Sequence, residues 1–236
     1  MNHEKLSMRL ERVATYIQQG SVLADIGSDH AYLPCYAVQK GISVKAIAGE
    51  VVEGPFQSAK KQVKLTELED PIDVRLGNGL DVLLPNEATC ITIAGMGGLL
   101  ISSILENGKD KLGAVKRLVL QPNVGSNIVR KWLLENDWEL VNEEILEEDG
   151  KIYEILIAER GIPTKPYAND AESALLFGPF LMAQRHEVFL KKWQLEKEHW
   201  QRIIQEMDVK SQNAATSSKR QELINQIQQV EVVLGI

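Results

Sequence analysis

The segment from Val22 to Pro34 constrains the fold of this chain more than any other feature of its sequence. A short apolar run ends there in Asp-Ile-Gly, turns through Ser-Asp-His and resumes an apolar pattern, which predicts a strand, a tight turn and a helix start. A carboxylate at a strand end accepts hydrogen bonds, and the glycine after it has no Cβ to keep a ligand from the backbone. The segment therefore suits a nucleoside-type ligand.

Strand-like and helix-like segments alternate as far as residue 135, which is the pattern of parallel strands joined by crossover helices. After the first strand, others are expected at 44–50, 72–76, 88–94 and 116–121, with helices at 32–39, 55–68, 99–105 and 126–135. Two more strands, 138–145 and 152–158, are joined by a short acidic turn and must pair antiparallel. The sequence predicts an α/β fold with a doubly wound, mostly parallel, Rossmann-like sheet that ends in antiparallel strands.

The composition changes after the Pro-rich segment 161–166. Residues 170–207 are expected to be helical over most of their length, and residues 219–234 to form a second helix after the polar segment 212–218. A chain of 236 residues suits one α/β domain and an appendage, so we divide it into a ligand-binding catalytic domain, 1–162, and a coiled-coil-like helical hairpin, 163–236. The positions expected to face each other are Leu175, Leu181, Phe189, Trp193, Trp200, Ile203, Ile204 and Met207 on the first stretch and Leu223, Ile227, Val230 and Val233 on the second.

Ligand-suited groups follow four of the expected parallel strands. In open α/β sheets such strand ends line one crevice, where ligands bind. A carboxylate after the second strand can take both ribose hydroxyls of a nucleoside, because two donors match its two acceptor oxygens. An amide after the third strand can reach the adenine ring, and glycines after the fourth let the backbone approach the ligand. The expected cofactor contacts are Asp25, Gly27, Ser28, Glu50, Val51, Asn78, Gly79, Ala94, Gly95, Met96 and Gly97.

Two ligand classes compete for this crevice. A dinucleotide cofactor needs G-x-G-x-x-G so that its pyrophosphate can lie on a helix start. The first turn has Gly27 alone, with Asp25 and Asp29 close by, and these two carboxylates would repel a pyrophosphate. The acidic turn favours a ligand with a cationic sulfonium and no phosphate, S-adenosylmethionine.

A helix is also expected ahead of the ligand turn, because apolar residues recur at helical spacing from Leu6 to Ile17. Lys5, Arg9 and Arg12 fall on its other faces and would point toward solvent or a polyanion. A solvated helix face is the simpler interpretation, and RNA contact is the one that their position raises. The formal net charge of −7 excludes a protein coated in basic residues but allows a local RNA-binding patch. Mixed charges along the expected hairpin favour a solvated surface over an RNA-holding arm.

The sequence predicts neither a metal site nor a membrane span. Neither the four histidines nor the two cysteines have metal-ligand spacing, and Cys35 and Cys90 are expected to be buried thiols. No apolar run approaches the roughly 20 residues that cross a bilayer. The first residues lack the layout of a secretory signal, so we expect a cytoplasmic protein, and we expect a monomer.

Four motifs together resemble the bacterial tRNA adenine-22 N1-methyltransferases. They are Asp25-Ile-Gly-Ser-Asp-His-Ala-Tyr-Leu-Pro34, Gly77-Asn-Gly-Leu80, Ile93-Ala-Gly-Met-Gly-Gly98 and Gln121-Pro-Asn123, and the resemblance spans the whole chain. It implies a Rossmann-like class I methyltransferase domain, S-adenosylmethionine as methyl donor, and transfer to N1 of an adenine in the tRNA core. Asn123 is assigned to RNA contact with the three basic residues of the N-terminal helix.

The chemistry of that reaction fits the residues after the fourth strand. Enzymes that methylate exocyclic amines commonly carry Asp/Asn-Pro-Pro-Tyr/Phe there, whereas this chain has Ala94-Gly-Met-Gly97. Ring N1 has a lone pair and no proton to lose, so that device is unnecessary. The product base is cationic, and a carboxylate would stabilise the developing charge. Asp29 is our candidate, with His30 and Tyr32 near an adenine that has left its stack; Asp29 contacting only the methionine amino group is the alternative.

Two other functions compete with this one. A methyltransferase of the same fold could act on another acceptor, such as a small molecule or a protein. A catalytically idle nucleotide-binding fold could use its helical arm to recruit partners. Binding of S-adenosylmethionine separates the idle fold from both enzymes, and methyl incorporation into unmodified tRNA separates the acceptors.

Overall fold

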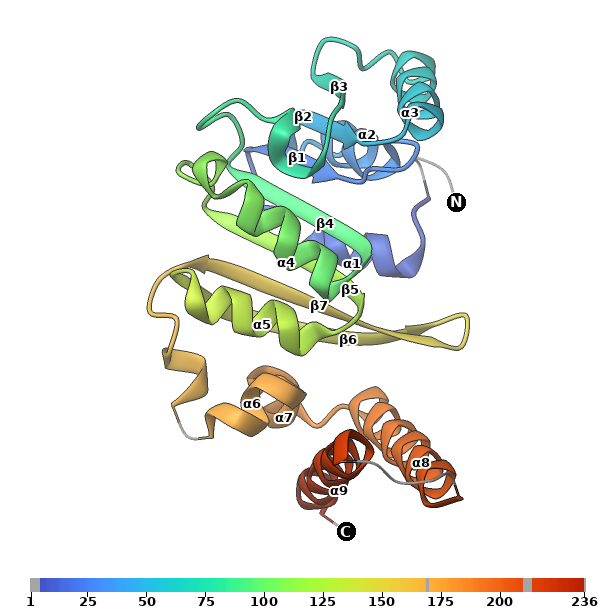
Figure 1. The fold of residues 1–236 in the computed structure, drawn as a ribbon. Helices are drawn as coiled ribbons and strands as arrows, with labels where there is room; N and C mark the ends of the chain where they lie inside the picture. Colours follow the sequence, from blue (N-terminus) through green and yellow to red (C-terminus); the bar gives the residue numbers. More distant parts are fainter. Residues whose placement is uncertain (1–4, 169, 210–213, 236) are drawn as a thin grey trace.

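A computed structural model describes residues 5–168, 170–209 and 214–235. Seven strands form one sheet in the order β3-β2-β1-β4-β5-β7-β6 (Figure 1). The strands are β1 (Ser21–Ile26), β2 (Ser43–Glu50), β3 (Ile72–Leu76), β4 (Cys90–Gly97), β5 (Arg117–Val124), β6 (Trp138–Glu148) and β7 (Lys151–Arg160). Strands β1 to β5 are parallel, and β7 pairs antiparallel with both β5 and β6. The predicted doubly wound sheet with terminal antiparallel strands is confirmed.

Helices cover both faces of the sheet and bury two apolar cores. On one face, α1 (Met8–Thr15), α2 (Tyr32–Gln39) and α3 (Glu53–Leu65) pack over residues such as Leu23 and Val119. On the other, α4 (Gly98–Asn107) and α5 (Ser126–Glu135) pack over residues such as Ile91 and Leu118. The buried strands are apolar on both sides, as parallel strands between two helical layers must be. Short 3-10 turns at Gly79–Val82, Lys109–Lys111 and Lys165–Tyr167 complete the connections.

The described residues 170–209 and 214–235 contain four α-helices rather than two. The stretch expected to be mostly helical divides into α6 (Ala171–Phe177), α7 (Pro179–Gln184) and α8 (Glu187–Val209). The breaks fall at Gly178, with φ of 90°, and at Arg185, with φ of 48°, because a left-handed residue cannot continue a right-handed helix. The last helix, α9 (Ala214–Leu234), begins earlier than predicted, so residues 214–218 are helical, while positions 212 and 213 of the expected spacer lie outside the described residues.

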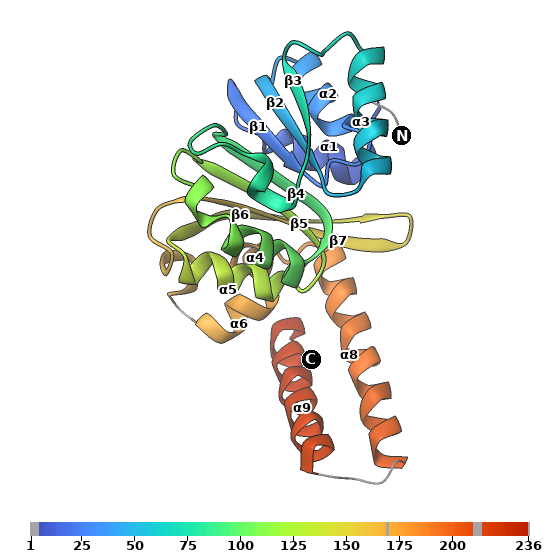
Figure 2. The same cartoon turned by 45° about the horizontal axis from the view of Figure 1, so that its top comes forward.

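Helices α8 and α9 lie side by side and extend away from the sheet, which confirms the predicted hairpin (Figure 2). The base of the hairpin forms a third apolar cluster with α6, α7 and Ile145 of β6. Six of the twelve expected facing positions lie in or against this cluster, whereas Leu175 packs on the core beneath α5 instead. The fully buried residues of the cluster include Phe177, Leu181, Phe189 and Val230.

Candidate functional site

The carboxyl ends of β3, β2, β1 and β4 lie next to one another at one edge of the sheet. The strand order confirms that the four ligand-suited turns predicted from the sequence are neighbours. Direct backbone contacts join them: the Gly27 N–H donates to the Gly49 carbonyl at 2.9 Å, and the Gly77 N–H donates to the Glu50 carbonyl at 2.7 Å. The ends of β1, β2 and β3 are therefore joined through the backbone.

Asp25 is the buried acceptor at the centre of this edge. It is the next-to-last residue of β1, and its carboxylate accepts from the Thr92 hydroxyl at 2.6 Å and the Ser28 hydroxyl at 2.7 Å. Burial raises the pKa of Asp25, while the two hydroxyls and the nearby Arg9 oppose that rise. Thr92 is not among the site residues predicted from the sequence, although a hydroxyl in the otherwise apolar strand β4 was the available signal.

The turn after β1 is strained. Asp29, His30 and Ala31 all have positive φ, at 42°, 42° and 52°. Each such residue costs on the order of 1–2 kcal/mol, and strain of this kind clusters at functional sites. The Glu50 carboxylate holds the turn by accepting from the Asp29 N–H, and the His30 ring stacks on Tyr32 with centroids 5.3 Å apart. Burial raises the pKa of Glu50, and the Asp29 N–H opposes that rise.

The end of β4 closes against this turn through a glycine and a methionine. A Cβ on Gly27, whose φ is 71°, would lie 2.1 Å from the Met96 methyl carbon, so no other residue fits there without moving Met96. Gly95 also has positive φ, at 80°. Its N–H donates to the Gln121 side-chain oxygen at 3.0 Å, and its carbonyl accepts from the Asn123 amide at 2.8 Å. The glycine turn is thereby fixed to the end of β5.

A cavity of about 290 Å3 opens between these two strand ends. It joins the turn after β1 to the end of β4 and reaches helix α1. The residues that line it are Arg9, Leu10, Asp25, Gly27, Ser28, Asp29, Tyr32, Leu33, Ala94, Gly95 and Met96. A small polar reactant can therefore meet carboxylate oxygens, backbone groups and an aromatic ring in a single space.

Arg9 lies in this cavity rather than pointing out to solvent. Its guanidinium donates to the Gln121 side-chain oxygen and lies over the Tyr153 ring, 5.3 Å from the centroid. Helix α1 is docked on the β6–β7 hairpin, because the Met8 N–H donates to the Glu148 carboxylate at 2.5 Å. Arg9 was expected to point toward solvent or a polyanion, and the structure places it partly buried at the cavity, because contacts with residues more than a hundred positions away set the orientation of the helix.

Other predicted site residues lie along the crevice but outside the cavity. Glu50 is buried, whereas Val51 and Asn78 are exposed at the ends of β2 and β3. His30 is half-exposed, with its Nε2 3.5 Å from the Asp29 carboxylate. The two glycines, Gly79 and Gly97, follow β3 and end β4.

The remaining predicted RNA contacts differ in their surroundings. Lys5 is exposed ahead of α1. Arg12 donates to the Glu144 carboxylate at 2.5 Å, so it is ion-paired to β6. The Asn123 amide is engaged by Gly95 and by Gln121, the latter at 3.2 Å. Among the four predicted RNA contacts, Arg9 is therefore the one that lines the first cavity.

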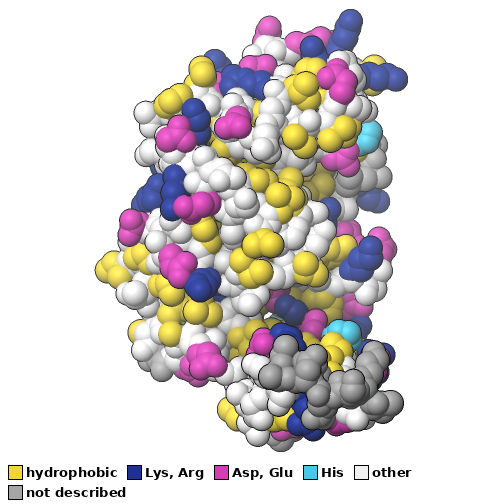
Figure 3. All heavy atoms as spheres, in the orientation of Figure 1, with side chains coloured by type: hydrophobic (Ala, Val, Ile, Leu, Met, Phe, Trp, Pro, Cys, Tyr) yellow, Lys and Arg dark blue, Asp and Glu magenta, His cyan; other side chains and the backbone are white. Residues whose placement is uncertain are grey.

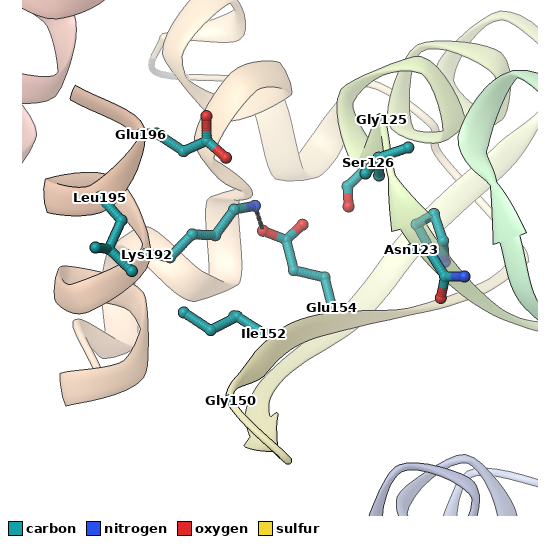
Figure 4. A pocket seen from close by; sticks show the side chains of 11 residues that line it. Asn123, Gly125, Ser126, Gly150, Ile152, Glu154, Lys192, Leu195 and Glu196 are labelled. Carbon is teal, nitrogen blue, oxygen red and sulfur yellow. Dashed lines mark hydrogen bonds and ion pairs between the residues drawn. The ribbon is translucent and has the colours of Figure 1, made fainter. Parts of the chain in front are cut away.

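A second cavity, of about 280 Å3, lies between the end of β5 and helix α8 (Figure 4). Asn123 and Ser126 face it from the sheet domain, and Lys192, Leu195 and Glu196 face it from α8. Across its floor the Lys192 ammonium donates to the buried Glu154 carboxylate. Asn123 connects the two cavities, because its amide is bonded to Gly95 of the first.

Neither a metal centre nor a membrane helix is found in the described part of the chain. Residues 5–168, 170–209 and 214–235 contain no group of three His, Cys, Asp or Glu side chains that could hold a metal ion. Within the same ranges, no helix is long and apolar enough to cross a bilayer. Both cysteines are free and buried, and burial raises the thiol pKa of each.

Comparison with known proteins assigns the chain to a family. Residues 23–232 match the family model for tRNA (adenine(22)-N(1))-methyltransferase. A protein of that name from Bacillus subtilis is 49% identical over 235 residues, which cover 99% of both chains. The crystal structure of the Bacillus subtilis m1A22 tRNA methyltransferase superposes with a TM-score of 0.93 at 47% identity, covering 98% of this chain and 99% of that one.

A complex with S-adenosyl-L-methionine is among the similar structures. It is that of Streptococcus pneumoniae Sp1610, which has a TM-score of 0.86 and 45% identity and covers 98% of this chain and all of that one. The fold, the acidic glycine turn and the full-length matches agree with one another. This chain belongs to the tRNA (adenine(22)-N(1))-methyltransferase family.

Proposed function

We propose that the cavity at the ends of β1 and β4 is where this enzyme transfers the methyl group of S-adenosylmethionine to N1 of adenine 22 in tRNA. The observation that carries the proposal is the lining of the cavity. It places the acidic glycine turn of Asp25 and Gly27, the glycine turn at Gly95, and the side chains of Asp29 and Tyr32 around one space. The family to which the chain belongs supplies the acceptor and its position.

In this proposal the cofactor lies along the crevice from β4 to β3. Asp25, Gly27, Ser28, Ala94, Gly95 and Gly97 hold the methionine half, where buried Asp25 offers an acceptor for the cationic end. Glu50 takes the two ribose hydroxyls. Val51, Asn78 and Gly79 contact the adenine ring of the cofactor, since they follow the next two strands along the edge. Met96 lies between the cofactor and the substrate base, next to Gly27.

The reaction is an in-line displacement in which the enzyme aligns two reactants. The N1 lone pair of adenine attacks the methyl carbon, the carbon–sulfur bond breaks, and its electron pair returns to sulfur. The positive charge leaves the sulfonium and appears on the adenine ring, so a carboxylate near the base stabilises the transition state. We assign that role to Asp29, whose side chain is 71% exposed and faces the cavity, with His30 and Tyr32 beside the base.

The RNA is proposed to approach over helix α1 and the end of β5. Arg9 would meet the nucleotide in the cavity, and Lys5, Arg12 and Asn123 would contact the backbone around it. We keep the division into a catalytic domain, 1–162, and a helical hairpin, 163–236. We further propose a monomer that works in the cytoplasm, where tRNA is available, and that uses neither a metal nor a membrane.

Replacement of Asp29 by Asn tests the catalytic assignment. We expect kcat for tRNA methylation to fall by about ten-fold or more, while the calorimetric affinity for S-adenosylmethionine stays within about three-fold of wild type. Asp110→Asn is the matched control, because Asp110 is 69% exposed and lies at a distance from the site, after α4. Unchanged kcat would remove Asp29 from the chemistry, and a loss confined to cofactor affinity would favour a contact with the methionine amino group.

A further inference from the structure

Four large apolar side chains are exposed beside the active-site crevice. Leu99 is 72% exposed, Leu100 53%, Val124 71% and Ile128 38%. They belong to the first turns of α4 and α5 and to the last residue of β5, and we name them the apolar rim. Scattered exposed apolar residues are ordinary on a protein surface, whereas a contiguous group beside a binding site marks a contact surface.

The backbone geometry places the two parts of the rim next to each other. Gly97 pairs with Val124 across β4 and β5, and a Cβ on Gly97 would lie 4.0 Å from a Val124 methyl carbon. A Cβ on Gly98 would lie 2.1 Å from the Gly125 carbonyl oxygen, so the starts of α4 and α5 touch. A side chain at Gly98 would prevent this close approach of the two helix starts, which places Leu99 and Leu100 of α4 near Val124 and Ile128.

The rim also lacks charge. The sequence has no Asp, Glu, Lys, Arg or His from Ala88 to Leu105 or from Leu118 to Val129, although 25% of the chain is charged. Figure 3 shows apolar side chains gathered over the middle of the face that carries α4 and α5, with charged side chains mostly nearer its edges. A surface that grips phosphates would be basic, so the partner groups that suit this one are uncharged and flat.

The place of the rim identifies the partner. It adjoins both cavities, because it follows Met96, which lines the first cavity, and includes Val124, which lines the second. N1 is on the pairing edge of adenine, so the base must leave its stack to react, and its departure opens a gap between the neighbouring bases. Apolar side chains such as Leu fill gaps of this kind in other proteins that unstack nucleic acids.

From these observations we infer that the apolar rim, led by Leu99 and Val124, packs against the bases that flank adenine 22 and fills the gap that this adenine leaves. The inference rests on the proposed function and adds a contact that drives extrusion of the base. A second copy of the chain suits the rim less well, because stable interfaces take about 20–30 residues from each partner and the rim offers four.

The test is the double variant Leu99→Ala, Val124→Ala, with the double variant Leu65→Ala, Val44→Ala as a matched control. Leu65 is 69% exposed and Val44 60%, and neither is near the crevice edge of β4 and β5. One readout is kcat/KM for methylation of a tRNA transcript. The other is the fluorescence of the same transcript carrying 2-aminopurine at position 22, which rises when that base unstacks.

We expect the rim variant to lose about ten-fold or more in kcat/KM and most of the fluorescence rise, while the control matches wild type. Leu99→Met in an otherwise wild-type chain should leave kcat/KM and the fluorescence rise unchanged, since methionine is an apolar side chain of similar volume. Calorimetric binding of S-adenosylmethionine to the rim variant should equal that of wild type, which shows that the variant is folded.

Two results would overturn the inference. One is a rim variant with wild-type kcat/KM and a wild-type fluorescence rise. The other is a wild-type dimer in sedimentation equilibrium that the rim variant dissociates, because the rim would then be a subunit interface. Failure of the proposed function looks different: the wild-type enzyme itself would not methylate position 22 of the transcript.

Discussion

At the scale of single residues, Asp25 lies at the centre of the crevice edge, where its burial disfavours the charged form of the carboxylate. The residue is 4% exposed, and its carboxylate accepts hydrogen bonds from two hydroxyl groups. Burial raises its pKa above the ordinary value of 3.8. A buried ionised carboxylate lowers the stability of the protein until a cationic ligand binds next to it. We therefore interpret Asp25 as a cofactor-binding residue that reduces the stability of the cofactor-free protein.

Replacement of Asp25 by Asn should separate its effect on stability from its effect on cofactor binding. A raised folded pKa means that the folded state binds the proton more tightly, so the contribution of Asp25 to stability is greatest below pH 3.8. That contribution falls as the pH rises through the folded pKa. At pH 7 the Asp25→Asn variant without cofactor should therefore melt at or above the wild-type temperature in scanning calorimetry.

The same substitution should weaken S-adenosylmethionine binding by about ten-fold or more in titration calorimetry, since a charged hydrogen bond to the cofactor is lost. A variant that melts well below wild type at pH 7 would contradict the argument from burial. Unchanged cofactor affinity would take Asp25 out of the methionine site.

The sequence predicted which residue types gather at the site better than it predicted their orientation. Asp25, Gly27 and Gly95 follow from local patterns, because a strand end and a glycine turn are set by neighbouring residues. The direction of Arg9 does not, since it depends on Gln121 and on the docking of α1 against the β6–β7 hairpin. The turn at residues 29–31 was predicted, but its left-handed backbone was not: Asp29 and His30 are residue types that adopt positive φ more often than most, whereas Ala31 gave no such signal.

At the scale of secondary structure elements, a buried ion network joins the sheet domain to the C-terminal helices. Arg130 of α5 is fully buried, and its guanidinium donates to Glu143 at 2.6 Å and to Glu154 at 2.7 Å. Glu143 also accepts from the Phe180 N–H of α7 at 3.1 Å, and Glu154 pairs with Lys192 of α8. Five elements therefore depend on one guanidinium.

Replacement of Arg130 by Met should destabilise the protein by about 3–5 kcal/mol, because it leaves the buried Glu143 carboxylate without its cationic partner and Glu154 with Lys192 alone. Lys131→Met on the same helix is the control, since Lys131 is 66% exposed and its carboxylate partner is 3.8 Å away. The control should change the free energy of unfolding by less than about 0.5 kcal/mol. Urea unfolding measures both, and similar values for the two variants would show that the network carries little stability.

The network also predicts acid sensitivity. Burial alone would raise the pKa of Glu154, but Lys192 and Arg130 lower it to about 2 from 4.5. A lowered folded pKa gives stability that is present above pH 4.5 and is lost as the pH falls toward 2. The contribution of Glu143 has the opposite pH dependence, because burial raises its pKa in spite of Arg130 and its stabilising effect is therefore lost as the pH rises.

Comparison with Lys192→Met isolates the Glu154 contribution. The variant should be less stable than wild type at pH 7, and the difference in unfolding free energy should shrink as the pH falls below 4.5, because protonated Glu154 no longer needs the ammonium. Urea unfolding at a series of pH values measures the difference. A difference that stays constant from pH 7 to pH 3 would contradict this account.

The strands and the helices of the sheet domain were predictable, because strong apolar periodicity and short connections fix them locally. The residue bounds predicted for α2, β3 and α5 agree with the structure. The C-terminal region was harder, since the apolar spacing continues through the breaks at Gly178 and Arg185. The Gly178-Pro179 pair was the signal for the first break, and Arg185 carried none.

At the scale of the whole molecule, the sheet domain and the α8–α9 hairpin meet beside the crevice. Asn123 lines the cavity between β5 and α8, and its amide donates to the Gly95 carbonyl of the first cavity (Figure 4). The acceptor and its position come from the family rather than from any single residue, because fold alone does not define a substrate. The central claim is that N1 of adenine 22 receives the methyl group in the first cavity.

The most direct measurement is mass spectrometry of tRNA after incubation with the enzyme and S-adenosylmethionine, using transcripts with adenine or 1-deazaadenine at position 22. 1-Deazaadenine has C–H in place of the attacking nitrogen N1, and both bases keep the exocyclic amine. We predict N1-methyladenine at position 22 of the first transcript and no methylation of that position in the second. Methylation of the 1-deazaadenine transcript at position 22, or a methyl group on another nucleotide of the first, would contradict the account.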